Sequence, residues 1–217
     1  MKTRKVVVAA YGVGNLRSVA SALESVGAEV DITDDPNAII AADRLILPGV
    51  GAFASCMAAL EDRGVREPVL TYLALERPTL GICVGMQMLF ESSSEFGRTE
   101  GLSVLGGQVD ELPRETLTGG RAHLPSIGWS RLIPPGEAEA CAWKGGLMDG
   151  LSGQESAYFV HSFAAKPSDP GVRLADTIYD TGPICAAVRK DMIHGVQFHP
   201  ERSGRWGLRI LENFINL

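Results

Sequence analysis

The stretch PTLGICVGMQMLF, residues 78–90, places a cysteine between two glycines at the junction of two apolar segments. One short apolar segment ends at Ile82 and another begins at Gly85, so that Cys83 lies where a strand turns sharply into a helix. Flanking glycines remove the Cβ atoms that would clash in such a turn. The spacing G-x-C-x-G is the thiol counterpart of the nucleophile elbow. The motif alone is equally compatible with a small buried thiol, so both interpretations stay open here.

The segments before and around this turn alternate between strand and helix patterns. Apolar runs bounded by turn residues predict buried strands at 4–10, 28–33, 43–49 and 79–82. Apolar residues at helical spacing predict helices at 15–27, 55–64, 66–76 and 85–92. This βαβ rhythm implies a parallel sheet that helices cover on both faces.

The pattern changes after about residue 105, where short predicted strands are separated by Gly, Pro and Asp turns. Residues 203–217 then predict a closing helix. The chain has no long linker, low-complexity segment or internal repeat. We therefore expect one domain over residues 1–217, an α/β fold with a mixed, largely parallel central sheet flanked by helices.

Composition and charge exclude several classes of protein. The 217 residues are 45% hydrophobic and 21% charged, with a net charge of −6, which argues against a basic nucleic-acid surface and a polybasic membrane patch. The sequence has no stretch long and apolar enough to span a membrane. Its four cysteines are scattered without a C-x-x-C motif, which argues against a disulfide framework or a zinc site and favours a reducing cytoplasm.

A thiol nucleophile needs a base, and the segment GVQFHPERSG, residues 195–204, offers one. His199 would lie at the tip of a strand, and Glu201 at i+2 could orient its imidazole. An ordinary surface loop with an incidental His and Glu is the alternative. His161 lies within a strand pattern and is better interpreted as a packed or substrate-lining residue.

The glycines of LPGVGAF, residues 47–53, follow a predicted strand and precede a helix. Such a loop can present backbone N–H groups to a developing negative charge, although a simple glycine-rich turn is commoner. The N-terminal YGVGNLRS has Arg17 where a dinucleotide-binding G-x-G-x-x-G requires its third glycine. The sequence therefore does not predict a dinucleotide site.

The motifs G-I-C-V-G-M-Q, residues 81–87, and F-H-P-E, residues 198–201, together resemble the class I glutamine amidotransferases. The resemblance extends over almost the whole chain. It implies a flavodoxin-like fold, L-glutamine as the substrate, and neither a cofactor nor a metal ion. It also implies that Cys83 attacks the glutamine amide to form a thioester, that His199 transfers the protons, and that Glu201 holds His199.

The same resemblance implies further site residues. Backbone N–H groups would form the oxyanion hole at Gly49, Val50 and Val84. The positions that match the glutamine pocket are Gln87, Glu95, His161, Ser162 and Phe163. Among these, Glu95 would be the counter-charge for the ammonium group of the substrate.

Several segments are similar to the glutaminase subunits of imidazole glycerol phosphate synthase, which act in histidine biosynthesis. They are YGVGNLRS, LPGVGAF, IGWS at 127–130, YFVHSF at 158–163, and GVQFHPERSG. This similarity implies a heterodimer in which ammonia passes into a (β/α)8 cyclase. The positions that match the partner interface are Arg17, Trp129, Tyr158 and Arg202, for which ordinary surface exposure is an equally good explanation.

The sequence departs from this pattern at four positions. Ala10 replaces an Asp, Ser126 a His, Ser130 an Asn, and Arg202 a Lys. None belongs to the expected triad, but three lie in segments expected to face the partner. A paralogous subunit that serves another synthase, for example in amidino-sugar formation, therefore stays open. A stand-alone cysteine γ-glutamyl hydrolase is a second open alternative, because such an enzyme would need neither Gln87 nor the segment YGVGNLRS.

Overall fold

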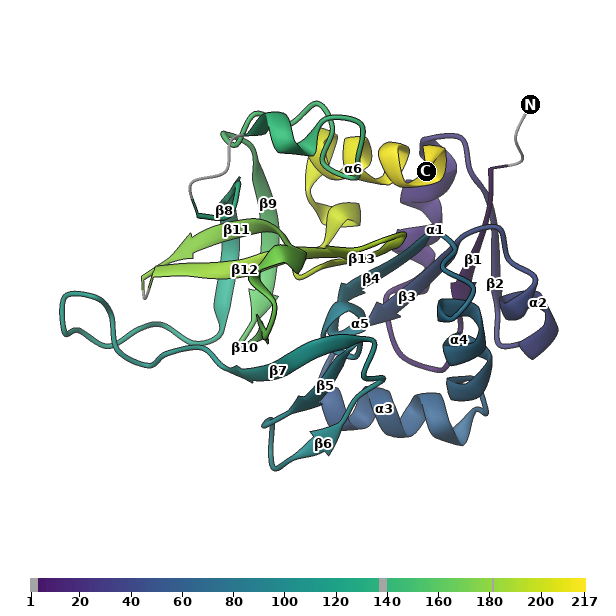
Figure 1. Ribbon diagram of the computed structural model, residues 1–217, viewed down its shortest axis with the longest axis horizontal. Coiled ribbons are helices and arrows are strands. Elements are labelled where there is room, and N and C mark those ends of the chain that lie inside the picture. Colours follow the sequence, from purple (N-terminus) through teal and green to yellow (C-terminus); the bar gives the residue numbers. More distant parts are fainter. Residues whose placement is uncertain (1–3, 137–139, 181) are drawn as a thin grey trace.

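The computed structural model describes residues 4–136, 140–180 and 182–217, which form two β-sheets and the helices around them (Figure 1). The larger sheet has the strand order β2-β1-β3-β4-β13-β12-β11-β8-β9, and the smaller has the order β10-β7-β5-β6. The strands are Lys5–Ala9 (β1), Glu29–Thr33 (β2), Leu45–Gly49 (β3), Thr79–Cys83 (β4), Phe90–Ser93 (β5), Thr99–Glu100 (β6), Leu105–Glu111 (β7), Ser126–Ile133 (β8), Ser156–His161 (β9), Phe163–Pro167 (β10), Arg173–Tyr179 (β11), Gly182–Lys190 (β12) and Ile193–Val196 (β13). The α-helices are Leu16–Ser25 (α1), Pro36–Ile40 (α2), Phe53–Asp62 (α3), Arg66–Leu73 (α4), Val84–Gln87 (α5) and Gly204–Asn216 (α6), and the 3-10 turns are Ala140–Trp143 (η1), Pro170–Val172 (η2) and Pro200–Arg202 (η3).

The half of the larger sheet that runs from β2 to β13 is parallel. Every residue of β3, β4 and β13 is buried, as expected for strands that are covered on both faces. The helices α1 and α6 lie on one side of this sheet and α3 lies on the other (Figure 1). The expected α/β fold, with a mixed central sheet flanked by helices, is confirmed.

The other half of the larger sheet is antiparallel. Beyond β13 the strands β12, β11, β8 and β9 pair in turn with reversed directions. This half brings β9 and the turn that follows it toward the carboxyl end of β4, where a site in an open α/β sheet is expected.

The helix predicted over residues 85–92 is wrong beyond Gln87. The helix α5 covers only Val84–Gln87, and the chain enters the strand β5 at Phe90. Phe90 lies opposite Leu105 in the parallel pairing of β5 with β7. A short unbroken apolar run suits a buried strand as well as a helix, and the pairing with a later segment decides between them. The smaller sheet that results is not anticipated by the sequence patterns.

None of the described helices combines the length and the hydropathy that crossing a lipid bilayer would take.

Candidate active site

Cys83 ends the central strand β4 in an unusual backbone conformation. Its φ is 55° and its ψ is −113°, a combination that residues with a Cβ atom rarely adopt. Strain of this kind persists only where the surrounding structure enforces it, and it gathers at functional sites. The side chain is 4% exposed and lies at a cavity of about 420 Å³.

The end of the neighbouring strand β3 packs directly against this turn. Gly49 lies opposite Cys83 in the parallel register of the two strands. A Cβ atom on Gly49 would lie 2.6 Å from the backbone nitrogen of Gly85, so only glycine fits there. The close approach places the following residue, Val50, at the cavity beside the nucleophile.

His199 reaches the same place from the other side of β4. The strand β13 runs parallel to β4 with Val196 opposite Ile82, and the chain continues past the end of the sheet to His199. The backbone N–H of His199 donates to the carbonyl of Tyr158 at 2.9 Å. Two segments that lie more than a hundred positions apart in the sequence therefore meet at the carboxyl edge of the sheet.

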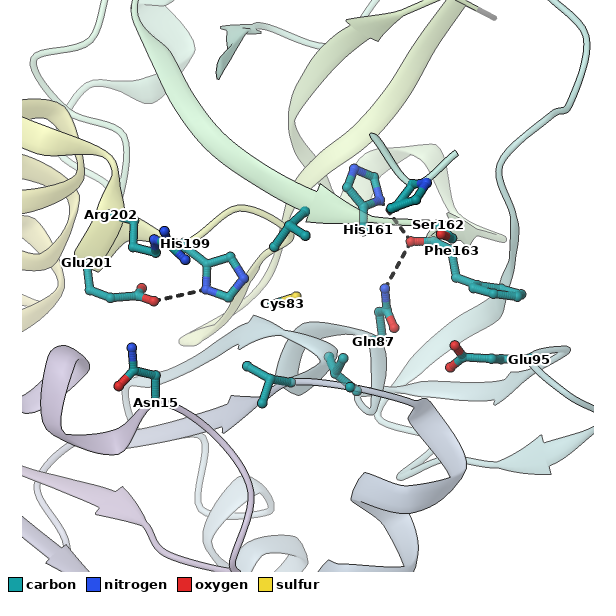
Figure 2. A pocket seen from close by; sticks show the side chains of 15 residues that line it. Asn15, Cys83, Gln87, Glu95, His161, Ser162, Phe163, His199, Glu201 and Arg202 are labelled. Atoms are coloured by element: carbon teal, nitrogen blue, oxygen red, sulfur yellow. Dashed lines mark hydrogen bonds and ion pairs between the residues drawn. The ribbon is translucent and has the colours of Figure 1, made fainter. Parts of the chain in front are cut away.

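Glu201 holds the imidazole of His199 through its Nδ1 atom. The distance from Nδ1 to Oε1 of Glu201 is 2.9 Å, and the two side chains are 7% and 1% exposed. The other ring nitrogen, Nε2, points toward the sulfur of Cys83 (Figure 2). Burial works to lower the pKa of His199, but the neighbouring Cys83 and the bonded Glu201 outweigh burial and raise this pKa from 6.5 to about 10.

The raised pKa of His199 predicts how its contribution to stability depends on pH. Because the folded protein binds this proton more tightly than the unfolded chain, the contribution is fully present below about pH 6.5 and is lost as the pH rises toward 10. We expect the difference in unfolding free energy between the parent and His199→Asn to shrink over that range in urea titrations. In a Glu201→Gln background this trend should weaken, because the carboxylate that raises the pKa is gone. A constant difference from pH 6 to 10 in both backgrounds would contradict the assignment.

The opposite wall of the cavity is organised around the carbonyl of Phe163. This oxygen accepts a hydrogen bond from Nε2 of Gln87 at 3.0 Å and lies 2.9 Å from Nδ1 of His161 (Figure 2). Since a carbonyl can only accept, Nδ1 of His161 carries a hydrogen atom. Burial lowers the pKa of His161, so its ring is neutral at pH 7. His161 is therefore a packed, pocket-lining residue with a defined tautomer.

The carboxylate of Glu95 lies at the Phe163 end of the cavity, away from the His199–Glu201 pair (Figure 2). Its Oε2 atom accepts the backbone N–H of Phe53, the first residue of α3, at 2.6 Å. An anion at a helix N-terminus is stabilised by the unpaired N–H groups there. This bond ties the wall of the pocket to the glycine-rich loop that precedes α3.

Two buried side chains form hydrogen bonds to backbone carbonyls of that loop. The thiol of Cys56 donates to the carbonyl of Val50 at 3.3 Å, and the hydroxyl of Tyr11 donates to the carbonyl of Pro48. Burial raises the pKa of Cys56 to about 11, so this thiol stays protonated and acts as a donor. Because the Val50 carbonyl is bonded inward to Cys56, the N–H of the same trans peptide, which belongs to Gly51, points the opposite way.

The cavity gathers most of the residues that the sequence analysis singled out for the site. Those that line it are Val50, Cys83, Val84, Gln87, Glu95, His161, Ser162, Phe163, His199, Glu201 and Arg202. Gly49 does not line it but lies buried beneath the turn. The lining residues that were not predicted are Asn15, Gly51, Pro125 and Val160. No motif marks these four as a group, although Asn15 and Gly51 lie within the glycine-containing segments already noted.

Three of the four residues expected at a partner interface form one cluster, which adjoins the cavity through the lining residue Arg202. The guanidinium of Arg202 lies 4.6 Å from the ring centre of Tyr158, and Trp129 meets the same ring edge-on at 6.1 Å. Trp129 is 58% exposed although it is large and apolar. Arg17 is exposed on a separate element, α1.

Within residues 4–136, 140–180 and 182–217, no group of three or more His, Cys, Asp or Glu side chains could hold a metal ion.

Comparisons with known proteins identify the family of the chain. The family model "Glutamine amidotransferase class-I" matches residues 7–217. "Imidazole glycerol phosphate synthase subunit HisH 1" of Legionella pneumophila (strain Lens) is 43% identical over 207 residues, covering 95% of this chain and 96% of the relative. The HisH subunit of Geobacter metallireducens is 46% identical over 205 residues, covering 94% of each chain.

Solved structures support the fold at much lower sequence identity. PurLQS from Thermotoga maritima superposes with a TM-score of 0.72 at 18% identity, covering 100% of this chain and 99% of that one. A crystal structure of a glutamine amidotransferase superposes with a TM-score of 0.70 at 20% identity, covering 98% of this chain and 99% of that one.

The fold and the family match together define a class I glutamine amidotransferase, and the chain belongs to that family. Within the family, it belongs with the HisH proteins.

Proposed function

We propose that the chain hydrolyses L-glutamine to glutamate and ammonia and delivers the ammonia to a synthase partner. One observation carries the proposal: Cys83 stands in a strained turn at a cavity, next to an imidazole that a buried carboxylate holds at 2.9 Å. A nucleophile, a base and a group that orients the base are the three roles that covalent amide hydrolysis requires.

In the proposed reaction His199 first takes the proton of the Cys83 thiol, in keeping with its raised pKa, and the resulting thiolate attacks the carbonyl carbon of the glutamine side-chain amide. The tetrahedral intermediate collapses when His199 returns that proton to the departing nitrogen, which releases ammonia and leaves a thioester on Cys83. Water, deprotonated by His199, then attacks the thioester. Glutamate departs, the thiol is restored, and Glu201 holds the imidazole throughout.

The remaining lining residues receive roles that suit this substrate. Glu95 provides the negative charge for the substrate ammonium at the end of the cavity away from His199. Its neighbours on that wall, which would orient the glutamine backbone and amide, are Gln87, His161, Ser162 and Phe163. Backbone N–H groups at Val50 and Val84, which line the cavity, would stabilise the oxyanion, whereas the third expected position, Gly49, is buried beneath the turn and would only let the loop approach closely.

The partner we propose is the (β/α)8 cyclase that makes imidazole glycerol phosphate and AICAR in histidine biosynthesis. The support is the 43–46% identity to HisH subunits, together with the cluster of Trp129, Tyr158 and Arg202 that adjoins the cavity through Arg202. A direct passage between subunits makes chemical sense, because ammonia released into neutral water is protonated and is then no longer a nucleophile. One domain over residues 1–217 and a reducing cytoplasmic setting complete the proposal.

Mixing the chain with the candidate cyclase tests the partner. We expect glutamine hydrolysis by the isolated chain to be slow and to rise about tenfold or more when the cyclase and its ribulosyl phosphate ligand are added, within the usual range of coupling between sites. Trp129→Ala should weaken this activation, because it removes the exposed anchor. The exposed Phe96, which is 92% exposed on a different part of the chain, supplies the control Phe96→Ala.

The outcomes of this experiment separate the alternatives. Full turnover by the isolated chain, with activity on γ-glutamyl peptides, would favour a stand-alone hydrolase. Activation by a different cyclase only would favour a paralogous subunit, for example one serving amidino-sugar formation.

A further inference from the structure

Gln197 lies directly behind the nucleophile, outside the cavity. It follows the last residue of β13, which lies opposite Ile82 of β4, so Gln197 comes level with Cys83 in the parallel register. Gln197 is fully buried, and its backbone N–H donates to the carbonyl of Ala186 at 2.8 Å. Its side-chain Nε2 lies 3.7 Å from the sulfur of Cys83.

The direction of this side-chain amide is dictated by a chain of hydrogen bonds that begins at the Phe163 carbonyl. That carbonyl can only accept, so the atom of Gln87 that faces it must be the NH2 group. The same NH2 group lies 2.9 Å from Gln197, which must therefore present its oxygen there. The NH2 group of Gln197 is left to face the sulfur of Cys83. No other orientation of the two amides satisfies all three contacts.

A donor aimed at the sulfur matters because a thiolate gains from every N–H group that points at it. The usual support for a thiolate at a turn of this kind is the N-terminus of the following helix. Here α5 spans only Val84–Gln87, so its aligned peptide dipoles are few. Gln197 approaches the sulfur from the interior, where the low dielectric strengthens the interaction.

We propose that Gln197 is a positioning residue for the nucleophile: its amide N–H holds the Cys83 sulfur at the turn and stabilises it as the thiolate, while Gln87 and Phe163 keep that amide in place from the substrate side. The catalytic consequence of this role rests on the proposed glutaminase function. The effect on the sulfur itself does not, because thiolate reactivity can be measured without glutamine.

The test compares Gln197→Met with the parent. Methionine has a similar length and volume but no donor, and Gln87 keeps its bond to the Phe163 carbonyl. The probe is iodoacetamide, and the rate of alkylation of Cys83 is measured by peptide mass spectrometry from pH 6 to 9. The exposed Gln154 supplies the matched control, Gln154→Met. Thermal unfolding of each variant reports whether the fold is retained.

We expect alkylation of Cys83 at neutral pH to slow by about tenfold in Gln197→Met, the usual effect of a hydrogen bond to a charged group. The control should keep the parental rate. For glutamine hydrolysis, kcat should fall while KM stays near the parental value, because Gln197 does not line the cavity. A folded Gln197→Met variant that alkylates at the parental rate across the whole pH range would overturn the proposal.

A second measurement does not depend on a Gln197 variant that folds. In protein labelled with ¹⁵N at the glutamine side chains, one amide signal should shift when Cys83 is replaced by alanine. If no glutamine side-chain signal responds, the contact is absent and the proposal fails. If alkylation of Cys83 slows in Gln197→Met as expected while the parent never hydrolyses glutamine, the positioning role of Gln197 is supported and the proposed glutaminase function is contradicted.

Discussion

Cys83→Ser should abolish glutamine hydrolysis, lowering kcat by about 10⁴- to 10⁶-fold, the scale on which enzymes lose activity when their nucleophile is removed. A serine hydroxyl at the turn is a poor nucleophile in a site built around a thiolate. The chain should still fold and bind the cyclase, so synthesis driven by added ammonium salts should persist in the complex. Glutamate release and ammonium-dependent synthesis, assayed side by side, separate the loss of chemistry from the loss of assembly.

Two further variants make the result specific to this sulfur. Cys185→Ser changes another buried cysteine, whose thiol donates to the carbonyl of Ala187 within β12, and it should retain hydrolysis. Glu201→Gln should lose less than Cys83→Ser, because it leaves the nucleophile in place and only loosens the hold on His199. If Cys83→Ser hydrolyses glutamine at near the parental rate, Cys83 is not the nucleophile.

Gly85→Ala should remove the turn itself. A Cβ atom on Gly85 would lie 1.8 Å from the carbonyl oxygen of Leu47 in β3, a backbone atom that cannot rotate away. The strand and the turn would have to separate, at a cost of about 3–5 kcal/mol, the upper range for a single substitution. For a chain of this length that corresponds to a fall in the thermal midpoint of roughly 10 °C. We expect glutamine hydrolysis to be lost as well.

Gly146 supplies the matched control for this prediction. An added Cβ atom there would lie 3.6 Å from its nearest neighbours, which is ordinary van der Waals contact. Gly146→Ala should therefore leave the thermal midpoint and the hydrolysis rate close to those of the parent. A Gly85→Ala variant with the parental midpoint and activity would show that the close packing of β3 against the turn is not required.

Much of the fold can be predicted from local patterns. The strand β4, the sharp turn after it and the helix α6 are predicted because unbroken apolar runs, paired glycines and helical apolar spacing each have a local signature. The triad candidates follow from short motifs in the same way. The helix predicted over residues 85–92 failed because Met88, Leu89 and Phe90 form an apolar run that is compatible with either structure. The later segment β7 offered Phe90 a strand partner, which local propensity cannot anticipate.

The position of Gln197 illustrates what the patterns could not reveal. In the sequence it is one polar residue within a strand-like segment, with nothing to distinguish it from a surface glutamine. Its burial, and its contact with a sulfur 114 positions away, arise from the parallel pairing of β13 with β4. The hydrogen bond from Cys56 to the carbonyl of Val50, and the one from the first residue of α3 to Glu95, likewise depend on packing between elements.

Which residues carry reactive groups and which segments turn can be predicted from short stretches of sequence, because a thiol between glycines and a His-Pro-Glu run are properties of a few neighbouring residues. Three features emerge only when the chain folds: the cavity that Cys83 and His199 share, the amide that faces the sulfur, and the length of α5. These features depend on the order and register of strands that are distant in the chain, and the free energy of that pairing is set by the whole core rather than by any short segment.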